Sequence, residues 1–389
     1  MQQVLFGAGS GSSSITLYGK VFSYNSFSAE SGASVIIPIN CTISKIRAYL
    51  SAAPGASTSY DVTAYVNGSP SALTVNILGS NTSGSDLVNT LSLSAGDLLS
   101  VAIIPNSSPT LSTLAFSVVL SAGVSEAVVI SSSPTTVASS GLFPLMGDRA
   151  AIHATLNRAI MPTAGTFSDL YFSLGAAPTA GKSKTATLRV NGVASALTTT
   201  VADAATSNSD LVNTVAVVAG DIVEYEFTNA GAPANSTVNC SMQFSPTVDG
   251  ESIYLCDDGS SSFNTGSVRY GRMVGTVSPS SAETDVDVPT DNVVLKKLYV
   301  GVNTAPGVGK SWVVALRRAS VATTSVVVTI SGTDTSGNDI VDSHSTLINL
   351  MNVIMTPSGT PDATTGRYSY VSTLSATVPV SKLPLLGVC

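Results

Sequence analysis

The chain has 389 residues, a net charge of −7 and a pI of about 4.7, and charged residues make up only 11% of it, against roughly 25% in an ordinary soluble protein. Its few Lys and Arg residues form no cluster larger than a pair. Nucleic-acid binding needs a focused positive surface, so the composition argues against a nucleic-acid partner. We also expect no membrane span, because no run of 18 apolar residues occurs, and no secretory signal.

The chain begins with a short apolar group, Val4, Leu5 and Phe6, which is followed by a Gly/Ser-rich stretch up to Ser14. This combination is typical of a flexible arm that becomes ordered against a neighbouring surface. We therefore predict an N-terminal anchoring arm in which Val4, Leu5 and Phe6 bind another protein. The alternative is a disordered tail without a role.

The residues that follow contain abundant strand signals and almost no helix signals. The segments are short and rich in β-branched residues, they often alternate between apolar and polar positions, and Gly, Pro, Asn or Ser separates them. In the first third of the chain they cover residues 34–39, 60–66, 72–78, 90–94 and 114–120. A turn every 8 to 12 residues predicts an antiparallel sandwich or jelly roll.

The pattern of this first third recurs twice. An Ala-Pro pair ends a similar apolar segment at residues 53–54, 177–178 and 305–306, at intervals of 124 and 128 residues. Repeats of this length each contain enough strands to bury a core of their own. We therefore predict an all-β chain of three tandem antiparallel β-sandwich, jelly-roll-like domains. Their predicted extents are residues 1–122 with the N-terminal arm, residues 123–247, and a divergent domain at residues 248–389.

Two turn motifs occur in the first two copies and are lost from the third. Asn67-Gly68 and Asn191-Gly192 each separate two alternating segments, as expected of type I′ hairpins. Ala-Gly-Asp at 95–97 and 219–221 predicts a second turn, in which the Asp bonds backbone amides or, alternatively, binds a cation. Where the first two copies have Asn-Gly, the third has Ala319-Ser320, so we expect a different loop there.

A third motif, Ser-Asp or Asn-Asp in a Ser/Gly-rich loop, is present in all three copies. Its aspartates are Asp86, Asp210 and Asp339. Calcium binding needs six to eight oxygen ligands, and each loop offers one carboxylate. We therefore predict structural loops rather than calcium sites.

No constellation of residues points to catalysis, a cofactor or a metal. The segments 180–184 and 307–311 resemble the end of a phosphate-binding loop, but the preceding glycine is missing and strands rather than helices are expected to follow. His153 and His344 occupy different positions in their repeats, and neither has a neighbour at metal-ligand spacing. We predict that the protein is not an enzyme and carries no cofactor.

The remaining candidate groups have structural interpretations. Asp257-Asp258 is the densest acidic spot and predicts a solvated turn, with a cation site as the alternative. Trp312 is the only Trp; we predict core packing, with subunit packing or ligand stacking as alternatives. The cysteines are not repeated, so we expect reduced thiols rather than a Cys240–Cys256 bridge. The four cysteines are Cys41, Cys240, Cys256 and Cys389.

The motif that joins Ala-Pro, Asn-Gly, Ser-Asp and Ala-Gly-Asp, clearest over residues 170–225, resembles a repeat met in tail, fibre and head-surface proteins of tailed bacteriophages. The resemblance implies β-sandwich modules displayed on the virion in oligomers. It also implies assembly in the host cytoplasm, with other virion proteins as partners. We therefore expect a structural virion protein, a capsid decoration or head-fibre component. The alternative is a tail-fibre adhesin that binds a host receptor or surface glycan.

The apolar content supports association as well. The chain is 44% hydrophobic with a mean hydropathy of +0.36, more than three small sandwiches need for their interiors. Symmetric association is the ordinary way to cover such an excess. We therefore predict a homo-oligomer, preferably a trimer.

Overall fold

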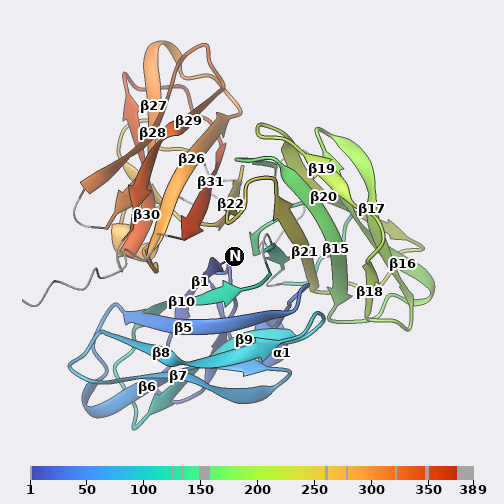
Figure 1. Ribbon diagram of the computed structural model, residues 1–389, viewed down its shortest axis with the longest axis vertical. Helices are drawn as coiled ribbons and strands as arrows, with labels where there is room; N and C mark the ends of the chain where they lie inside the picture. The colour runs from blue at the N-terminus through green and yellow to red at the C-terminus, as the bar shows by residue number, and fades with distance from the viewer. Residues whose placement is uncertain are drawn as a thin grey trace, which may run out of the picture.

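The computed structural model describes residues 2–123, 126–133, 135–148, 158–258, 262–276, 279–319, 322–346 and 350–374, and strands make up most of it. Helical structure in these ranges is limited to α1 (Glu30–Ala33) and η1 (Glu283–Asp285). The sheets are almost entirely antiparallel and pack as sandwiches, which confirms the predicted all-β sandwich class. Figure 1 shows three lobes around a common centre.

Residues 2–121, here called the first repeat, form two sheets. The inner sheet, nearer the centre in Figure 1, has the strand order β1-β10-β5-β8, and the outer sheet has the order β3-β2-β9-β6-β7 with β4 also paired to β9. The strands are β1 (Gln2–Ser10), β2 (Leu17–Gly19), β3 (Ser26–Phe27), β4 (Val35–Ile36), β5 (Cys41–Leu50), β6 (Gly55–Val66), β7 (Ser69–Gly79), β8 (Ser83–Leu93), β9 (Leu98–Asn106) and β10 (Thr113–Ser121).

Residues 127–246, the second repeat, reproduce this arrangement. The inner sheet has the order β13-β11-β21-β15-β18 with β19 also on β15, and the outer sheet has the order β12-β20-β16-β17 with β14 on β20. The strands are β11 (Ala127–Ser132), β12 (Gly141–Phe143), β13 (Gly147–Asp148), β14 (Ala159–Ile160), β15 (Gly165–Leu174), β16 (Thr179–Val190), β17 (Val193–Asp203), β18 (Ser207–Asp210), β19 (Val215–Val217), β20 (Ile222–Ala230) and β21 (Val238–Pro246).

Residues 252–374, the third repeat, form the same arrangement of two sheets. The inner sheet has the order β24-β22-β31-β26-β29 and the outer sheet has the order β23-β30-β27-β28 with β25 on β30. The strands are β22 (Ser252–Asp257), β23 (Arg269–Gly271), β24 (Gly275–Thr276), β25 (Val288–Pro289), β26 (Val293–Val302), β27 (Gly307–Arg318), β28 (Ala322–Gly332), β29 (Ser336–Ser345), β30 (Leu350–Ser358) and β31 (Gly366–Leu374).

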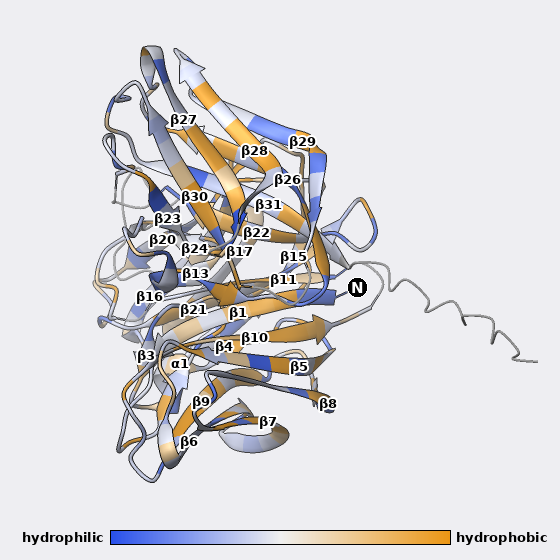
Figure 2. Ribbon diagram, turned by 90° about the vertical axis from the view of Figure 1, so that its left-hand side faces the viewer, coloured by the Kyte–Doolittle hydropathy of each residue, from blue (hydrophilic) through white to orange (hydrophobic). Residues whose placement is uncertain are grey.

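The alternation seen in the sequence explains how the sheets face one another. In β7, Leu73, Val75 and Ile77 are buried while the residues between them are exposed, because successive side chains of a strand point to opposite faces. Burial contributes about 25 cal/mol for each Å² of apolar surface removed from water, so such a strand is held mainly by its inward face. In Figure 2 the apolar side of this alternation appears as orange segments along the strands of the interior.

The predicted Asn-Gly hairpins are confirmed. Asn67 and Gly68 have φ values of 49° and 82°, and Asn191 and Gly192 have values of 52° and 78°, the left-handed pair that a type I′ turn requires. The hairpins join β6 to β7 and β16 to β17. Of the third copy's Ala319-Ser320, Ser320 lies outside the described residues.

The three repeats meet at a pseudo-threefold axis. Gly147 lies opposite Ser131 of β11, Gly275 lies opposite Cys256 of β22, and Phe22 donates its N–H to the carbonyl of Phe6 in β1. These three equivalent positions have positive φ values of 92°, 91° and 59°, in the order Gly147, Gly275 and Phe22.

The same three positions touch one another. A Cβ placed on Gly147 would lie 2.4 Å from the Cα of Gly275 and 3.3 Å from the carbonyl oxygen of Phe22. Equivalent residues that meet at one point are the mark of a rotation axis.

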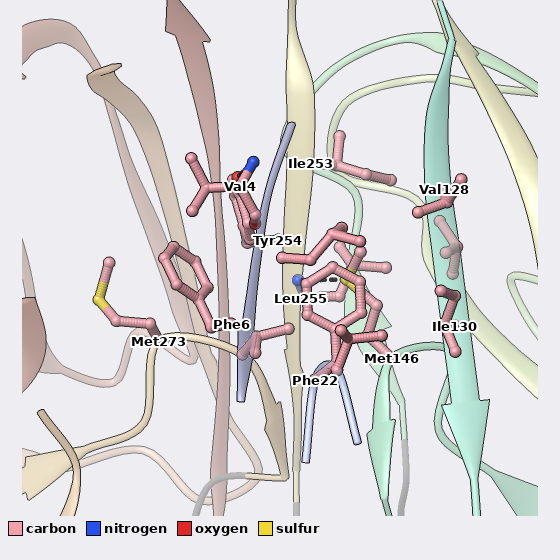
Figure 3. Packing of buried hydrophobic residues seen from close by; sticks show 14 of the residues in the cluster. Val4, Phe6, Phe22, Val128, Ile130, Met146, Ile253, Tyr254, Leu255 and Met273 are labelled. Carbon is pink, nitrogen blue, oxygen red and sulfur yellow. Dashed lines mark hydrogen bonds between the residues drawn. The ribbon is translucent and has the colours of Figure 1, made fainter. Parts of the chain in front are cut away.

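The buried side chains of the three repeats join in one connected hydrophobic cluster. The first strand of each repeat packs against its counterparts at the centre, so the interiors of the three sandwiches are continuous there (Figure 3). The division into three domains stays a prediction. This central packing buries apolar side chains between repeats of one chain. Other large apolar side chains, such as Val88 and Val212, stay exposed. The homo-oligomer, with a trimer preferred, stays a prediction.

Candidate interaction surface

The N-terminal segment is part of the fold and not a free arm. Residues 2–10 form β1, which pairs with β10 along its whole length. Val4, Leu5 and Phe6 are 1%, 0% and 1% exposed, so they are not available to an outside partner in this fold. The prediction of a flexible arm is wrong for these residues, because the apolar group has partners inside the same chain, 250 residues away.

Those partners are in β22. The hydroxyl of Tyr254 accepts the N–H of Val4 at 3.0 Å and lies 3.1 Å from the Val4 carbonyl, to which it can donate. The ring of Phe6 lies 5.4 Å from the ring of Tyr254, centroid to centroid, and Phe22 packs edge-on against the same Tyr. Figure 3 shows these side chains beside those of β11 and β22. β1 therefore ties the first repeat to the third.

Gln3 connects all three repeats. Its Nε2 donates to the carbonyls of Val128 at 3.0 Å and Ile253 at 3.4 Å, and its Oε1 accepts the N–H of Val128 at 2.8 Å. Gln3 is fully buried, so both ends of its amide need these partners. The sequence gives no signal for this contact, because the partner groups are backbone atoms 125 and 250 residues away.

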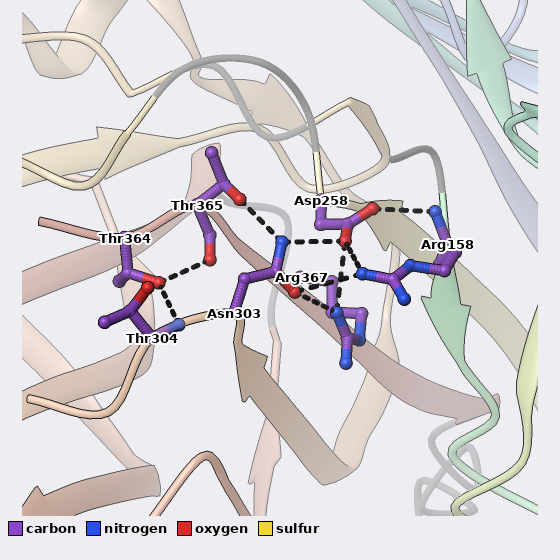
Figure 4. Close-up of polar contacts among 7 residues, drawn as sticks. All are labelled: Arg158, Asp258, Asn303, Thr304, Thr364, Thr365 and Arg367. Carbon is purple, nitrogen blue, oxygen red and sulfur yellow. Dashed lines mark hydrogen bonds and ion pairs between the residues drawn. The ribbon is translucent and has the colours of Figure 1, made fainter. Parts of the chain in front are cut away.

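The expected solvated turn at Asp257-Asp258 is wrong. Both side chains are buried, at 1% and 0% exposure. Oδ2 of Asp258 pairs with Arg158 at 3.0 Å and with Arg367 at 3.1 Å, and it accepts the side-chain amide of Asn303 at 3.0 Å. Figure 4 shows the cluster, which joins the second repeat to the third. Burial lowers the pKa of Arg367 and Asp258 opposes that shift, as expected of a buried charge held by its counter-ion.

Ion pairs also close the junction between the first and third repeats. Asp291 accepts Lys45 Nζ at 3.0 Å and Arg47 at 3.2 Å, from the third repeat to the first. Lys297, the equivalent of Lys45, pairs with Glu251 at 2.6 Å. Burial alone would raise the pKa of Asp291 and of Glu251, but the hydrogen bonds and charges of their lysines hold both below the usual value. Ion pairs as well as apolar packing therefore join the third repeat to the first and to the second.

The buried carboxyl of Asp287 has less compensation from nearby positive charge than Asp258, Asp291 and Glu251 have. Asp287 accepts the side-chain amide of Asn352 at 2.6 Å, and the same amide donates to Glu283 at 2.9 Å. Burial and the neighbouring Glu283 raise the pKa of Asp287 to about 6, against the partial opposition of Asn352 and Arg317. This group titrates between the first and third repeats, in the wall of a cavity that Tyr24 and Arg272 also line.

The other candidate residues occupy structural positions. Trp312 is fully buried and packs edge-on against Phe263, which confirms core packing. Cys41, Cys240 and Cys256 are buried free thiols, as predicted; Cys389 lies outside the described residues. The two segments that resemble phosphate-binding loops fall in the strands β16 and β27.

The described residues contain no group of three or more His, Cys, Asp or Glu side chains that could hold a metal ion. His344 lies on β29, and His153 is outside the described residues. No helix in the same part of the chain is both long enough and apolar enough to cross a membrane.

The repeated aspartates anchor bulges in the edge strands, as predicted for structural loops. Oδ1 of Asp86 accepts the N–H groups of Val88 at 3.0 Å and Asn89 at 3.1 Å, and Oδ2 accepts the N–H of Thr74 at 3.1 Å. Burial would raise the pKa of Asp86, but these hydrogen bonds hold it below the usual value. Asp210 and Asp339 make the same three backbone contacts in their repeats.

Each bulge presents two apolar side chains to solvent. These are called the exposed doublets: Leu87-Val88, Leu211-Val212 and Ile340-Val341. The first residue of each is 53%, 55% or 57% exposed and the second is 87%, 87% or 89% exposed, in chain order. Opposite each bulge the neighbouring strand has a residue with positive φ: Lys45, Asp169 and Lys297. The sequence shows the repeated motif but not that its apolar residues stay in water.

Aromatic side chains contribute little to the surface. All 23 Trp, Phe and Tyr residues lie in the described part of the chain, and each of them is buried or partly buried. Sugar-binding surfaces usually offer exposed aromatic rings on which a pyranose stacks. The glycan-binding alternative stays a prediction.

No family model and no curated protein matches the chain.

Proposed function

We propose that this chain is a structural virion protein displayed on the particle surface, as a capsid decoration or head-fibre component, that acts through multivalent protein contacts. The observation that carries the proposal is the pseudo-threefold body made by three repeats of one chain. Equivalent surfaces repeated around an axis are suited to several simultaneous contacts, which raise avidity without any single strong site. The resemblance of the Ala-Pro to Ala-Gly-Asp motif to phage surface repeats supports the same assignment.

The junctions between repeats support a role that depends on shape. Gln3, Asp258 and Asp291 each join two or three repeats through buried hydrogen bonds or ion pairs. Such junctions hold the relative positions of the lobes more firmly than a flexible linker could. A partner would therefore meet a preformed surface, and little conformational entropy would be lost on binding.

Particles of the virus that encodes this chain test the proposal. Purified wild-type particles should contain the protein by quantitative mass spectrometry, and antibodies should reach it on intact particles. Particles produced without the gene should lack it and recover it when the purified chain is added. Absence from purified wild-type particles, or detection only after the particles are opened, would contradict the proposal.

A further inference from the structure

We propose that the three exposed doublets are one docking surface, and that its partner is a set of three symmetry-related copies of a single shell subunit. This inference rests on the proposed function and names the contact by which the chain would attach. The doublets lie in three different lobes, on or beside the edge strands of the inner sheets. Figure 2 shows β8 and β29, which carry the first and third doublets, toward the same side of the molecule.

The doublets recur at equivalent positions of all three repeats. The third repeat has lost the Asn-Gly and Ala-Gly-Asp turns but keeps the Asp-anchored bulge with two apolar residues. The most exposed side chains, Val88, Val212 and Val341, agree in exposure to within two percentage points. Single exposed apolar residues are ordinary, but an apolar pair at equivalent positions of all three repeats, including the divergent third, points to a shared contact.

The loop that carries each doublet is preorganised by its Asp carboxylate. In every bulge the Asp carboxylate accepts two N–H groups of the bulge itself. It also accepts one N–H group of the preceding strand, β7, β17 or β28, which belongs to the outer sheet. These bonds fix the backbone on which the apolar side chains stand. Binding then requires little further ordering of the loop, which favours affinity.

The charges beside the doublets indicate what kind of partner fits. The residue opposite the bulge is Lys45 in the first repeat, Asp169 in the second and Lys297 in the third. Lys45 and Lys297 are already paired with Asp291 and Glu251, and Asp169 has the opposite charge. The feature common to the three sites is therefore the apolar pair, and the shared contact is hydrophobic. The chain offers three equivalent apolar contacts around its pseudo-threefold axis. A partner with threefold or local threefold symmetry presents the same apolar pocket three times, so each doublet can occupy one pocket.

The test uses the purified full chain, added in increasing amounts to particles produced without the gene, with bound protein measured by co-sedimentation. Val88→Ser, Val212→Ser and Val341→Ser are compared singly and together. Val308→Ser is the matched control, because Val308 is 87% exposed but the other two repeats have Ala56 and Ala180 at its position. All four valines are exposed, so thermal unfolding should be unchanged in every variant.

We expect each single substitution to weaken binding by about tenfold, the order of one lost apolar anchor, and the triple variant to lose binding altogether. The control should bind as the wild type does, and saturation should correspond to one chain for every three shell subunits at the site. A triple variant that binds like the wild type, or an effect confined to one of the three positions, would overturn the docking surface. A wild-type chain that does not bind particles at all would instead overturn the proposed function, and this inference with it.

Discussion

Asn191 and Asp221 bond to each other where two turns meet, with Asn191 Nδ2 donating to Asp221 Oδ1 at 2.8 Å. Asn67 and Asp97 make the same bond at 2.8 Å in the first repeat. In both cases the Asn Oδ1 also accepts the N–H of the residue after the Asp, at 2.9 Å. The third repeat lacks both motifs, and their joint absence follows from the pairing, since each side chain provides the partner of the other.

This pairing predicts coupling between the two turns. Asn191→Ala and Asp221→Ala should each lower the free energy of unfolding by about 1 kcal/mol, and the double variant should lose less than the sum. Denaturant unfolding measures the cycle. The control combines Asn191→Ala with Asp97→Ala, which belong to different turn pairs and should be additive. Additive losses for Asn191 and Asp221 would show that the bond contributes nothing.

The contact at the pseudo-threefold axis predicts an unusually costly glycine substitution. Gly147→Ala places a Cβ against the backbone of Gly275 and also requires a side chain at a φ of 92°. Gly250→Ala is the control, because Gly250 has a φ of 81° and a Cβ there would meet nothing within 4 Å. The control should lose about 1 kcal/mol from the backbone conformation alone. Equal losses of stability in the two variants would mean that the repeats do not approach closely at the axis.

The burial of β1 predicts that its apolar residues maintain stability. Phe6→Ala should lower the free energy of unfolding by about 3–5 kcal/mol, the usual cost of removing a buried aromatic ring. Ser14→Ala, at an exposed position of the segment that follows β1, should leave stability unchanged. If Phe6→Ala unfolded like the wild type, residues 2–10 would be a free arm after all.

Asp287 predicts a specific dependence of stability on pH. Its pKa is raised to about 6 from an ordinary value of 3.8, so between these values the folded chain binds more protons at this site than the unfolded chain. The contribution of Asp287 to stability is therefore fully present at low pH and is lost as the pH rises from about 4 to about 6. Asp287→Asn should remove this loss and make the variant relatively more stable at pH 7 than at pH 4, compared with the wild type.

The measurement is the denaturant midpoint at a series of pH values between 4 and 7. Asp334→Asn, which removes an exposed carboxylate, is the control and should follow the wild-type curve closely. A difference between wild type and Asp287→Asn that stays constant across the series would contradict the raised pKa.

The sequence predicted those parts of the fold that local patterns determine. Alternation located the strands, Asn-Gly gave the hairpins, and the repeated aspartates were correctly read as structural. These features depend on residues within about a dozen positions of one another in the chain, or paired across one hairpin. Repetition also made the common architecture of the three segments visible.

The junctions between repeats could not be predicted, because their partners lie 100 or more residues apart. From the sequence, Val4 and Phe6 are expected to be an exposed anchor, but in the fold they contact Tyr254. Asp258 is expected to be solvated, but in the fold it pairs with Arg158 and Arg367. The exposure of the doublets could not be predicted from the sequence either. An apolar pair in a strand-like segment predicts burial, and only the bulge held by the Asp carboxylate turns it to solvent.

Cryo-electron microscopy of particles with and without the gene tests the central claim most directly. We expect a three-lobed density on the outer surface of wild-type particles, with its pseudo-threefold axis on a threefold or local threefold axis of the shell. That density should be missing from particles without the gene. Identical outer surfaces in the two kinds of particle would contradict the claim that the chain is a displayed virion protein.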